Sequence, residues 1–210
     1  MPLRVKGLCL GPVQTNCYLL IDTDAGDAVV VDPADEAPRI RAALEDEGAT
    51  LTAIWLTHAH FDHLGALADL LDDGPVPVYL HPDDLPLYRQ TEEQAAMFGL
   101  QVRPPRAPTE PLAHEQVMRL GPYAARCLHT PGHAPGHIAF AFDGEGFVLC
   151  GDALFMGSIG RTDLPFGDHG TLIDSIRTQL LTLPDDTVAH PGHGPSTSIG
   201  AERRSNPFLL

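Results

Sequence analysis

The segment LTHAHFDHLGAL, residues 56–67, constrains the fold of this chain more than any other stretch. Within six positions, directly after the apolar run AIWL at 53–56, it gathers four side chains that can bind a metal: His58, His60, Asp62 and His63. The apolar run predicts a buried strand, and a loop after a rigid strand end can turn side chains toward one point. Neutral imidazole suits Zn, Fe, Mn or Ni, and a carboxylate widens that choice. We therefore predict a metal site; the alternative is a polar helix start that Asp62 and His63 merely cap.

Three further segments resemble one another: in each, a strand end and a glycine are followed by one side chain of the metal-binding type. HTPGHAPGH at 129–137 presents His133, LCGDALF at 149–155 presents Asp152, and AHPGHGPS at 189–196 presents His193. Segments so far apart in the chain cannot form a local metal finger. We expect them to converge at one edge of the fold, because loops on a rigid scaffold are where sites are built.

Short apolar strands alternate with a few helices along the chain. Runs rich in Val, Leu and Ile predict strands at 4–10, 15–22, 27–32, 52–57, 76–80, 116–120, 124–129, 137–142, 147–151 and 187–190. Apolar spacing and glycine stops predict helices at 37–48, 62–74, 82–99 (broken) and 171–183, with a proline-rich loop at 101–115. Strands followed by helices in both halves predict an α/β sandwich in one domain, residues 1–210.

The charge of the chain excludes one class of partner. The formal net charge is −15, with 28 acidic against 13 basic side chains, and a nucleic-acid surface needs Lys and Arg. No apolar run is long enough for a membrane helix, and the N-terminus lacks the apolar core of a signal peptide. We expect a cytoplasmic protein with a small-molecule substrate, no nucleic acid and no membrane; a homodimer is left open.

The order of these motifs carries a resemblance. HAHFDH, followed by His133, Asp152 and His193, resembles the signature of the metallo-β-lactamase fold superfamily. HTPGHAPGH, GDALF and the closing HPGHGPSTSIGAERRSNPF are similar, more narrowly, to the glyoxalase II (hydroxyacylglutathione hydrolase) group. The resemblance implies a four-layer αββα sandwich with two divalent metal ions at one edge, Zn first and Fe or Mn as alternatives. It also implies the ligands: His58, His60 and His133 for one ion, Asp62, His63 and His193 for the other, and Asp152 as the bridge.

Two metal ions in such a site favour hydrolysis of a carbonyl compound. Ions roughly 3.5–4 Å apart can share a bridging hydroxide, which attacks the carbonyl carbon while one ion polarises the oxygen. A thiolate leaving group, with a pKa near ~8.5, needs little protonation. Most titratable groups of the site are ligands, which favours thioesters over amides, although Asp62 could shuttle a proton. We expect Asp62 and Asp152 to be catalytic and the substrate to be an anionic thioester of the acyl-glutathione type.

The sequence departs from full-length glyoxalase II in two places. The family's C-terminal helical region, which helps to hold glutathione, has no counterpart before Leu210, so we expect the short form of the domain. GSIGRTD at 157–163 replaces a lysine-containing stretch and is shared with short members and with persulfide dioxygenases. Arg161 is the candidate anchor for a substrate carboxylate, because its planar fork suits bidentate pairing. The alternative is an Arg161 paired with Asp163 or Asp168.

Other activities remain open on the same residues. His58, His133 and Asp152 alone form a two-histidine, one-carboxylate set that suits mononuclear iron and O₂. A mononuclear iron persulfide dioxygenase is therefore the alternative to the hydrolase, and a lactonase on the same fold is a further one.

The remaining histidines receive structural interpretations. His129 and His137 are expected to donate to ligands or pack in the core, and His190 to orient His193. Three others lie in predicted loops and are expected to be solvated: His81, His114 and His169.

Overall fold

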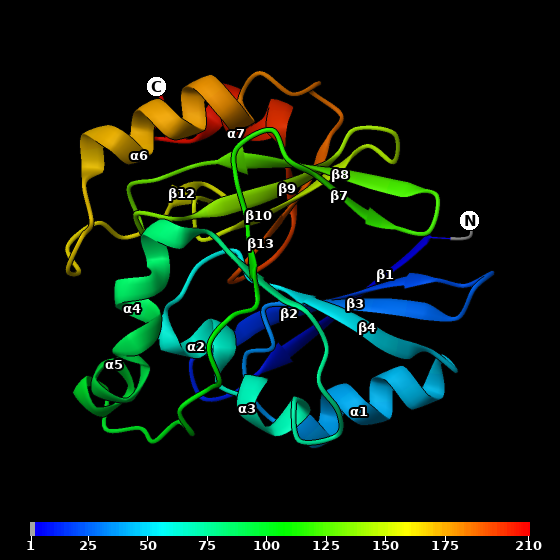
Figure 1. The fold of residues 1–210 in the computed structure, drawn as a ribbon. Helices are drawn as coiled ribbons and strands as arrows, with labels where there is room; N and C mark the ends of the chain where they lie inside the picture. Colours follow the sequence, from blue (N-terminus) through cyan, green and yellow to red (C-terminus); the bar gives the residue numbers. More distant parts are fainter. Residues whose placement is uncertain (1–2) are drawn as a thin grey trace.

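The computed structural model describes residues 3–210 and consists of two six-stranded sheets packed face to face, with helices on both outer faces (Figure 1). The first sheet has the order β1-β2-β3-β4-β5-β6: β1 (Leu3–Leu10), β2 (Thr15–Asp22), β3 (Asp27–Val31), β4 (Thr50–Trp55), β5 (Val78–Leu80) and β6 (Glu110–Pro111). The second has the order β14-β13-β10-β9-β8-β7: β7 (Val117–Leu120), β8 (Tyr123–His129), β9 (Ile138–Phe142), β10 (Phe147–Gly151), β13 (Val188–Pro191) and β14 (Thr197–Ser198). The predicted four-layer α/β sandwich is confirmed.

The helices cover the two outer faces and one edge of the sandwich (Figure 1). Outside the first sheet lie α1 (Ala37–Asp46) and α3 (Leu67–Leu70), and outside the second lie α6 (His169–Ser175) and α7 (Ile199–Ser205). At the edge are α2 (Phe61–Leu64), the 3₁₀ turn η1 (Pro82–Asp84), α4 (Leu85–Arg89) and α5 (Thr91–Met97). A π-helical turn, η2 (Ile176–Leu180), follows α6, and β11 (Leu154–Phe155) pairs with β12 (Ser158–Ile159). Within the part of the chain that the structure describes, no helix has the length and apolarity to cross a membrane.

Three apolar layers hold the sandwich together, because the central strands are buried on both faces. Along β2, Leu19 and Ile21 pack toward α1, whereas Tyr18 and Leu20 pack between the two sheets. This is the two-residue alternation of a strand with both faces covered. Trp55 contributes an aromatic surface to the layer between the sheets, with its ring centroid 5.3 Å from that of Phe140 and 6.4 Å from that of Phe142.

The sheet topology brings the ends of several strands to one edge. β3 pairs with β4, and β10 pairs with β13, in parallel. The carboxyl ends of parallel strands meet at the same sheet edge, where α/β proteins place their ligands. The histidine- and aspartate-bearing loops follow β4, β8, β10 and β13, so the fold delivers all of them to neighbouring positions.

The structure corrects several predicted elements. The helix predicted at 62–74 is two short helices, α2 and α3, because the amide of Ala66 donates to the carbonyl of Pro33 (2.9 Å) rather than continuing the first helix. The helix predicted at 171–183 begins at His169, since Asp168 caps it by accepting from the amide of Thr171 (2.7 Å), and it continues as a π-helical turn. The predicted loop at 101–115 contains β6, and the prediction missed four short elements: β11, β12, β14 and α7.

Candidate metal centre

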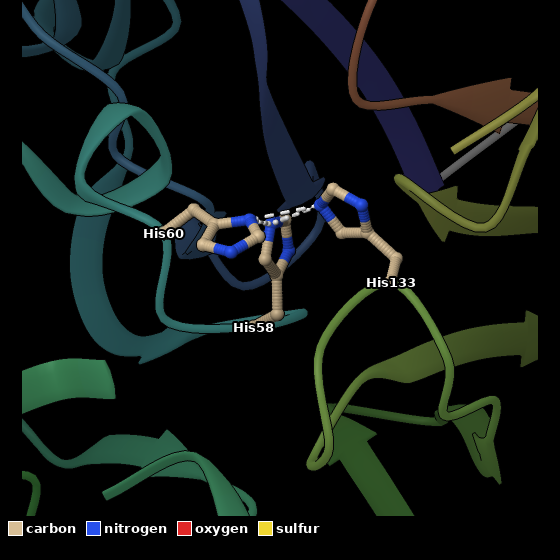
Figure 2. Close-up of side chains that lie close together, drawn as sticks. All are labelled: His58, His60 and His133. Atoms are coloured by element: carbon tan, nitrogen blue, oxygen red, sulfur yellow. Dashed lines mark hydrogen bonds between the residues drawn. The ribbon is translucent and has the colours of Figure 1, made fainter. Parts of the chain in front are cut away.

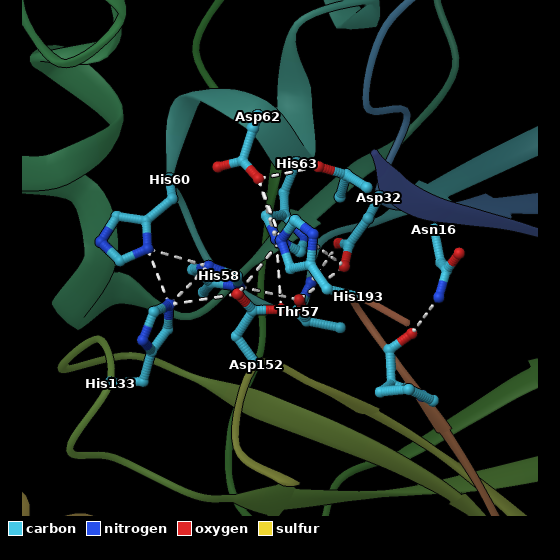
Figure 3. Close-up of polar contacts among 12 residues, drawn as sticks. Asn16, Asp32, Thr57, His58, His60, Asp62, His63, His133, Asp152 and His193 are labelled. Atoms are coloured by element: carbon cyan, nitrogen blue, oxygen red, sulfur yellow. Dashed lines mark hydrogen bonds and ion pairs between the residues drawn. The ribbon is translucent and has the colours of Figure 1, made fainter. Parts of the chain in front are cut away.

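Seven side chains predicted as ligands lie together at the edge of the sandwich (Figure 3). The loop after β4 and the start of α2 bring four of them, and the loops after β8, β10 and β13 bring one each: His58, His60, Asp62 and His63, then His133, Asp152 and His193. All but Asp62 and His193 are buried. The four segments, which are far apart in the sequence, therefore converge at one edge of the sandwich, as predicted.

The first triad consists of His58, His60 and His133 (Figure 2). The Nδ1 of His60 lies 3.0 Å from the Nε2 of His58 and 2.8 Å from the Nε2 of His133. The two Nε2 atoms are 3.3 Å apart. Ligand nitrogens about 2.0–2.1 Å from a tetrahedral ion are separated by about 3.4 Å, so this spacing suits one metal ion.

Neighbouring groups fix the protons of two of these rings away from the triad. The hydroxyl of Thr57 donates to Asp32 (2.6 Å), so it must accept from the Nδ1 of His58 at 3.0 Å. The Nδ1 of His133 donates to the carbonyl of Arg161 (2.8 Å). The Nε2 atoms of both rings therefore turn lone pairs toward each other, which cannot form a hydrogen bond but can bind a shared cation.

The second triad consists of Asp62, His63 and His193. The Oδ2 of Asp62 lies 3.6 Å from the Nε2 of His63 and 3.2 Å from the Nε2 of His193. The hydroxyl of Thr15 donates to the same oxygen (2.8 Å), and the Nδ1 of His63 faces Asp32 (2.9 Å). His63 thus directs its free nitrogen into the triad, in the same way as the first set of rings.

Asp152 lies between the two triads (Figure 3). Its Oδ1 is 3.4 Å from the Nε2 of His63. Its Oδ2 is 3.6 Å from the Nε2 of His133 and 3.4 Å from the Nε2 of His193. Each carboxylate oxygen therefore faces donors of the second triad, and one of them also faces the first.

Two buried atoms indicate that the site suits a metal. Among the described residues, the Nε2 of His63 and the Oδ1 of Asp152 are the buried side-chain atoms without a hydrogen-bond partner. Buried polar groups are nearly always paired, so an orphaned pair that faces one point needs an explanation. A divalent cation between them would satisfy both atoms, and the mixed nitrogen and oxygen donors suit Zn, Fe or Mn.

The electrostatics of the two triads differ. Burial is the main cause that lowers the pKa of His58 well below its usual value and the pKa of His60 to about 3, so both imidazoles are neutral. Burial would also lower the pKa of His63 and His193, but the surrounding carboxylates raise the first well above its usual value and the second to about 9. Without a metal, protons on the second triad balance the carboxylates, which is the charge that a cation would supply.

Two buried aspartates that the sequence analysis did not single out support the ligand loops. Asp32, at the end of β3, accepts from the amide and the hydroxyl of Thr57 (2.7 and 2.6 Å) and from His63. Asp84, in η1, accepts from the amides of Ala59 (2.8 Å) and Gly136 (2.5 Å), and so joins the loop of the first histidines to the loop of His133. The signal for Asp32 is a carboxylate directly after the apolar strand VVV; Asp84 gives no comparable signal.

The remaining histidines have different structural roles. His137 is buried, donates to Thr130 (2.7 Å) and accepts from the amide of Asp152 (3.0 Å), as expected for a supporting residue. The Nδ1 of His190 lies 2.8 Å from the hydroxyl oxygen of Ser196. Its ring is therefore held by Ser196, and its expected role in orienting His193 stays a prediction. His81 stacks on His129 with ring centroids 4.4 Å apart, rather than being freely solvated. His169 begins α6 instead of lying in a loop, and it is exposed, as expected.

A cleft opens beside the two triads. Five of the converging side chains line it and form its polar floor: His60, Asp62, His133, Asp152 and His193. Arg161 also lines the cleft. Arg161 is exposed and forms a bidentate pair with Asp163, with both N–O distances at 2.7 Å. This is the structural alternative considered for Arg161, although the position of the residue at the cleft leaves its role as a substrate anchor a prediction.

Comparison with known proteins gives one consistent family. A family model described as "Metallo-beta-lactamase superfamily" matches residues 10–193. The chain is similar to the "Probable metallo-hydrolase YqgX" of Bacillus subtilis, 38% identical over 99% of this chain and 98% of the relative. It is also similar to the "Hydroxyacylglutathione hydrolase GloC" of Haemophilus influenzae, 42% identical over 93% of each chain. Among solved structures, TTHA1623 in a di-iron-bound form superposes with a TM-score of 0.89 at 46% identity, covering 97% of this chain and 100% of that one.

Proposed function

From its membership of the metallo-β-lactamase superfamily, as a metallo-hydrolase, we propose that this chain hydrolyses thioesters of the acyl-glutathione type. The observation that supports the proposal most is the place of Asp152, whose two oxygens face donors of both triads. A carboxylate in that place suits a two-metal site. The relative named as a hydroxyacylglutathione hydrolase supports the substrate class.

The residues that would hold the ions are those of the two triads: His58, His60 and His133 for one, Asp62, His63 and His193 for the other, with Asp152 shared. Bound there, two divalent ions would supply a water-derived nucleophile at neutral pH and would polarise the thioester carbonyl. The identity of the ions is part of the proposal: Zn is the first expectation, and the di-iron form of TTHA1623 supports Fe as an alternative.

The side chains that line the cleft determine how protons can be transferred during the reaction. Asp62 lies at the cleft, and His63 and His193 lower the pKa of its carboxyl to about 2 against the opposing effect of burial. Its ionised carboxylate accepts from the hydroxyl of Thr15 (2.8 Å), which orients it toward the second triad. So low a pKa suits a metal ligand better than a base, and the role of Asp62 in moving a proton stays a prediction. Apart from Glu93, the carboxylates and imidazoles that line the cleft are Asp152 and members of the triads. A thiolate, which leaves without much protonation, therefore suits the site better than an amine.

The second candidate function is a mononuclear iron dioxygenase that acts on persulfides. It is favoured by one feature: His58, His133 and Asp152 stand together, with the two Nε2 atoms 3.3 Å apart and His133 3.6 Å from Asp152. Such a set leaves positions open for O₂ on one iron.

Metal analysis of the purified protein, combined with two assays, tests both candidates. We expect two ions per chain and hydrolysis of S-D-lactoylglutathione, which is measured by the release of the free thiol. One iron per chain with O₂ uptake on glutathione persulfide, and no thioester hydrolysis, would instead favour the dioxygenase.

A further inference from the structure

One wall of the cleft beside the triads is apolar. Six side chains from four parts of the chain form it: Val13, Phe61, Leu87, Met97, Phe98 and Leu164. Met97 is 69% exposed and Phe98 50% exposed, although both are large and apolar. Large apolar side chains exposed side by side mark a binding surface more often than isolated ones do. We call this wall the Phe98 subsite.

The Phe98 subsite is in contact with the segment that carries His60 and Asp62. Phe61 lies in sequence between His60 and Asp62, and its ring packs under that of Phe98 with centroids 5.2 Å apart. Gln94 of α5 fixes this arrangement, since its side chain accepts from the amide of Phe61 (3.3 Å) and donates to the carbonyl of Leu87 (2.7 Å). An apolar group that touches Phe98 would therefore lie beside the segment that carries His60 and Asp62.

The charges of the cleft do not favour an anion in the Phe98 subsite. Among the described residues that line the cleft, Arg161 is the one lysine or arginine, and its Nε and Nη2 donate to Asp163. Glu93 adds a negative charge on α5, next to the apolar wall. The whole cleft, polar floor included, has a volume of about 180 Å³, so the Phe98 subsite is part of that space. A dry apolar cavity of about 150 Å³ accepts benzene, so the subsite suits a group no larger than a phenyl ring.

We propose that the Phe98 subsite binds an uncharged, apolar group of the substrate, about the size of a phenyl ring or a short alkyl chain. This inference rests on the proposed thioester hydrolysis and narrows its substrate class. A thioester extends in two directions from the reacting carbon, so the apolar group is attached either to the carbonyl carbon or to the sulfur.

Two matched series of thioesters test the proposal on the metal-loaded full chain. The acyl series compares the phenylacetyl with the lactoyl ester of N-acetylcysteamine, and the thiol series compares the acetyl esters of benzyl mercaptan and N-acetylcysteamine. We expect the wild type to prefer the apolar member of one series by about ten- to a hundredfold in kcat/KM, as apolar pockets discriminate. The series in which the preference appears identifies the half of the substrate that occupies the subsite.

Substitutions in the wall then connect the preference to Phe98. Phe98→Ser is expected to remove most of the preference while changing kcat/KM of the polar member less than about threefold. Met97→Ser is the second variant, should the first fold poorly. Phe208→Ser is the matched control, because Phe208 is similarly exposed (48%) and lies outside the cleft. A wild type without apolar preference in either series, or equal losses for both members in Phe98→Ser, would overturn the proposal.

Failure of the proposed function gives a different result. If the wild type hydrolyses neither S-D-lactoylglutathione nor any of the four esters, thioester hydrolysis is wrong, and binding of phenylacetate and lactate by calorimetry tests the subsite alone. Phenylacetate binding at least about tenfold tighter than lactate, with the difference lost in Phe98→Ser, supports the subsite. Equal binding of the two acids would overturn it.

Discussion

The Nδ1 of His63 lies 2.9 Å from the Oδ2 of Asp32, so a buried carboxylate determines which nitrogen of this imidazole faces the second triad. The same carboxylate accepts from the hydroxyl of Thr57, which in turn accepts from His58 in the first triad. One residue at the end of β3 therefore orients a histidine in each triad. Partners of this kind raise the basicity of a ligand and fix its ring.

Asp32→Asn should weaken metal binding by about ten- to a hundredfold, because an amide keeps one acceptor but cannot satisfy all three donors. Asn is the appropriate replacement, since residue 32 has a φ of 50°, a region that Asn tolerates. Competition with a chelator measures the affinity. Asp35→Asn, at an exposed neighbouring position, is the control. Unchanged affinity in Asp32→Asn would show that the ring of His63 is held by other contacts.

Substitutions in the second triad separate the two candidate functions. If hydrolysis needs two ions, Asp62→Ala and His63→Ala should each lower thioester hydrolysis at least about a hundredfold and remove about one ion per chain. If the protein is a mononuclear dioxygenase, both variants should keep their iron and much of their O₂ uptake. Asp152→Ala should abolish either activity, because its carboxylate faces donors of both triads. Full hydrolysis in Asp62→Ala would contradict the two-metal site.

Gly192→Ala should remove metal binding without unfolding the chain. A Cβ at this position would collide with the Oδ1 of Asp152 and would lie 2.7 Å from the Cε1 of His63, so the two side chains must move apart. Metal content and thioester hydrolysis measure the effect, and circular dichroism checks the fold. Gly144→Ala, where a Cβ would meet nothing within 4 Å, is the matched control. Equal metal content in the two variants would mean that the cluster accommodates the extra methyl group.

The candidate ligand segments after β8, β10 and β13 were predictable from the sequence because each consists of a strand, a glycine and a side chain of the metal-binding type. His133 and His193 each follow a Pro-Gly pair, and such local patterns can be recognised without knowledge of tertiary contacts. Asp84 was not predictable, because its two partners, the amides of Ala59 and Gly136, belong to the backbone of remote loops. The break between α2 and α3 was missed for a similar reason, since the amide of Ala66 bonds to a carbonyl more than thirty residues earlier in the chain. Contacts of this kind depend on tertiary structure, which a helical spacing pattern does not encode.

Arg161→Ala tests the predicted anchor for a substrate carboxylate. Its pair with Asp163 is exposed on both sides, and such pairs contribute at most about 1 kcal/mol, so a substrate carboxylate can replace Asp163. A charge-assisted hydrogen bond contributes about 1.5–3 kcal/mol, so KM for an acyl-glutathione should rise about ten- to a hundredfold in the variant. The metal content should not change, and a neutral thioester should lose far less. Equal losses for both substrates would assign Arg161 to its structural pair with Asp163.

The free energy of unfolding should depend on pH because the Asp84 carboxyl is buried. Burial raises the pKa of Asp84 to about 7, against two backbone donors that lower it. Because the folded-state pKa lies above the usual 3.8, its contribution to stability is fully present below about pH 4 and is lost as the pH rises through about 7. Relative to Asp84→Ala, the wild-type free energy of unfolding should fall by about 1.4 kcal/mol per pH unit in that window. Denaturant unfolding of both proteins with a chelator present measures this difference, and a flat difference would mean that Asp84 stays ionised throughout.

Each triad draws its donors from both sheets, and this has a consequence for the chain as a polymer. His60 and His133 are 73 residues apart in sequence, yet one ion would hold both. A cation in either triad then acts as a cross-link that closes a long loop, and closing a loop of this length constrains the unfolded chain by about 4 kcal/mol. Removing the metal would therefore act on the whole sandwich as reduction acts on a disulfide: the cleft edge of the two sheets would exchange its amide hydrogens first, while the apolar layers farther from that edge would keep their protection.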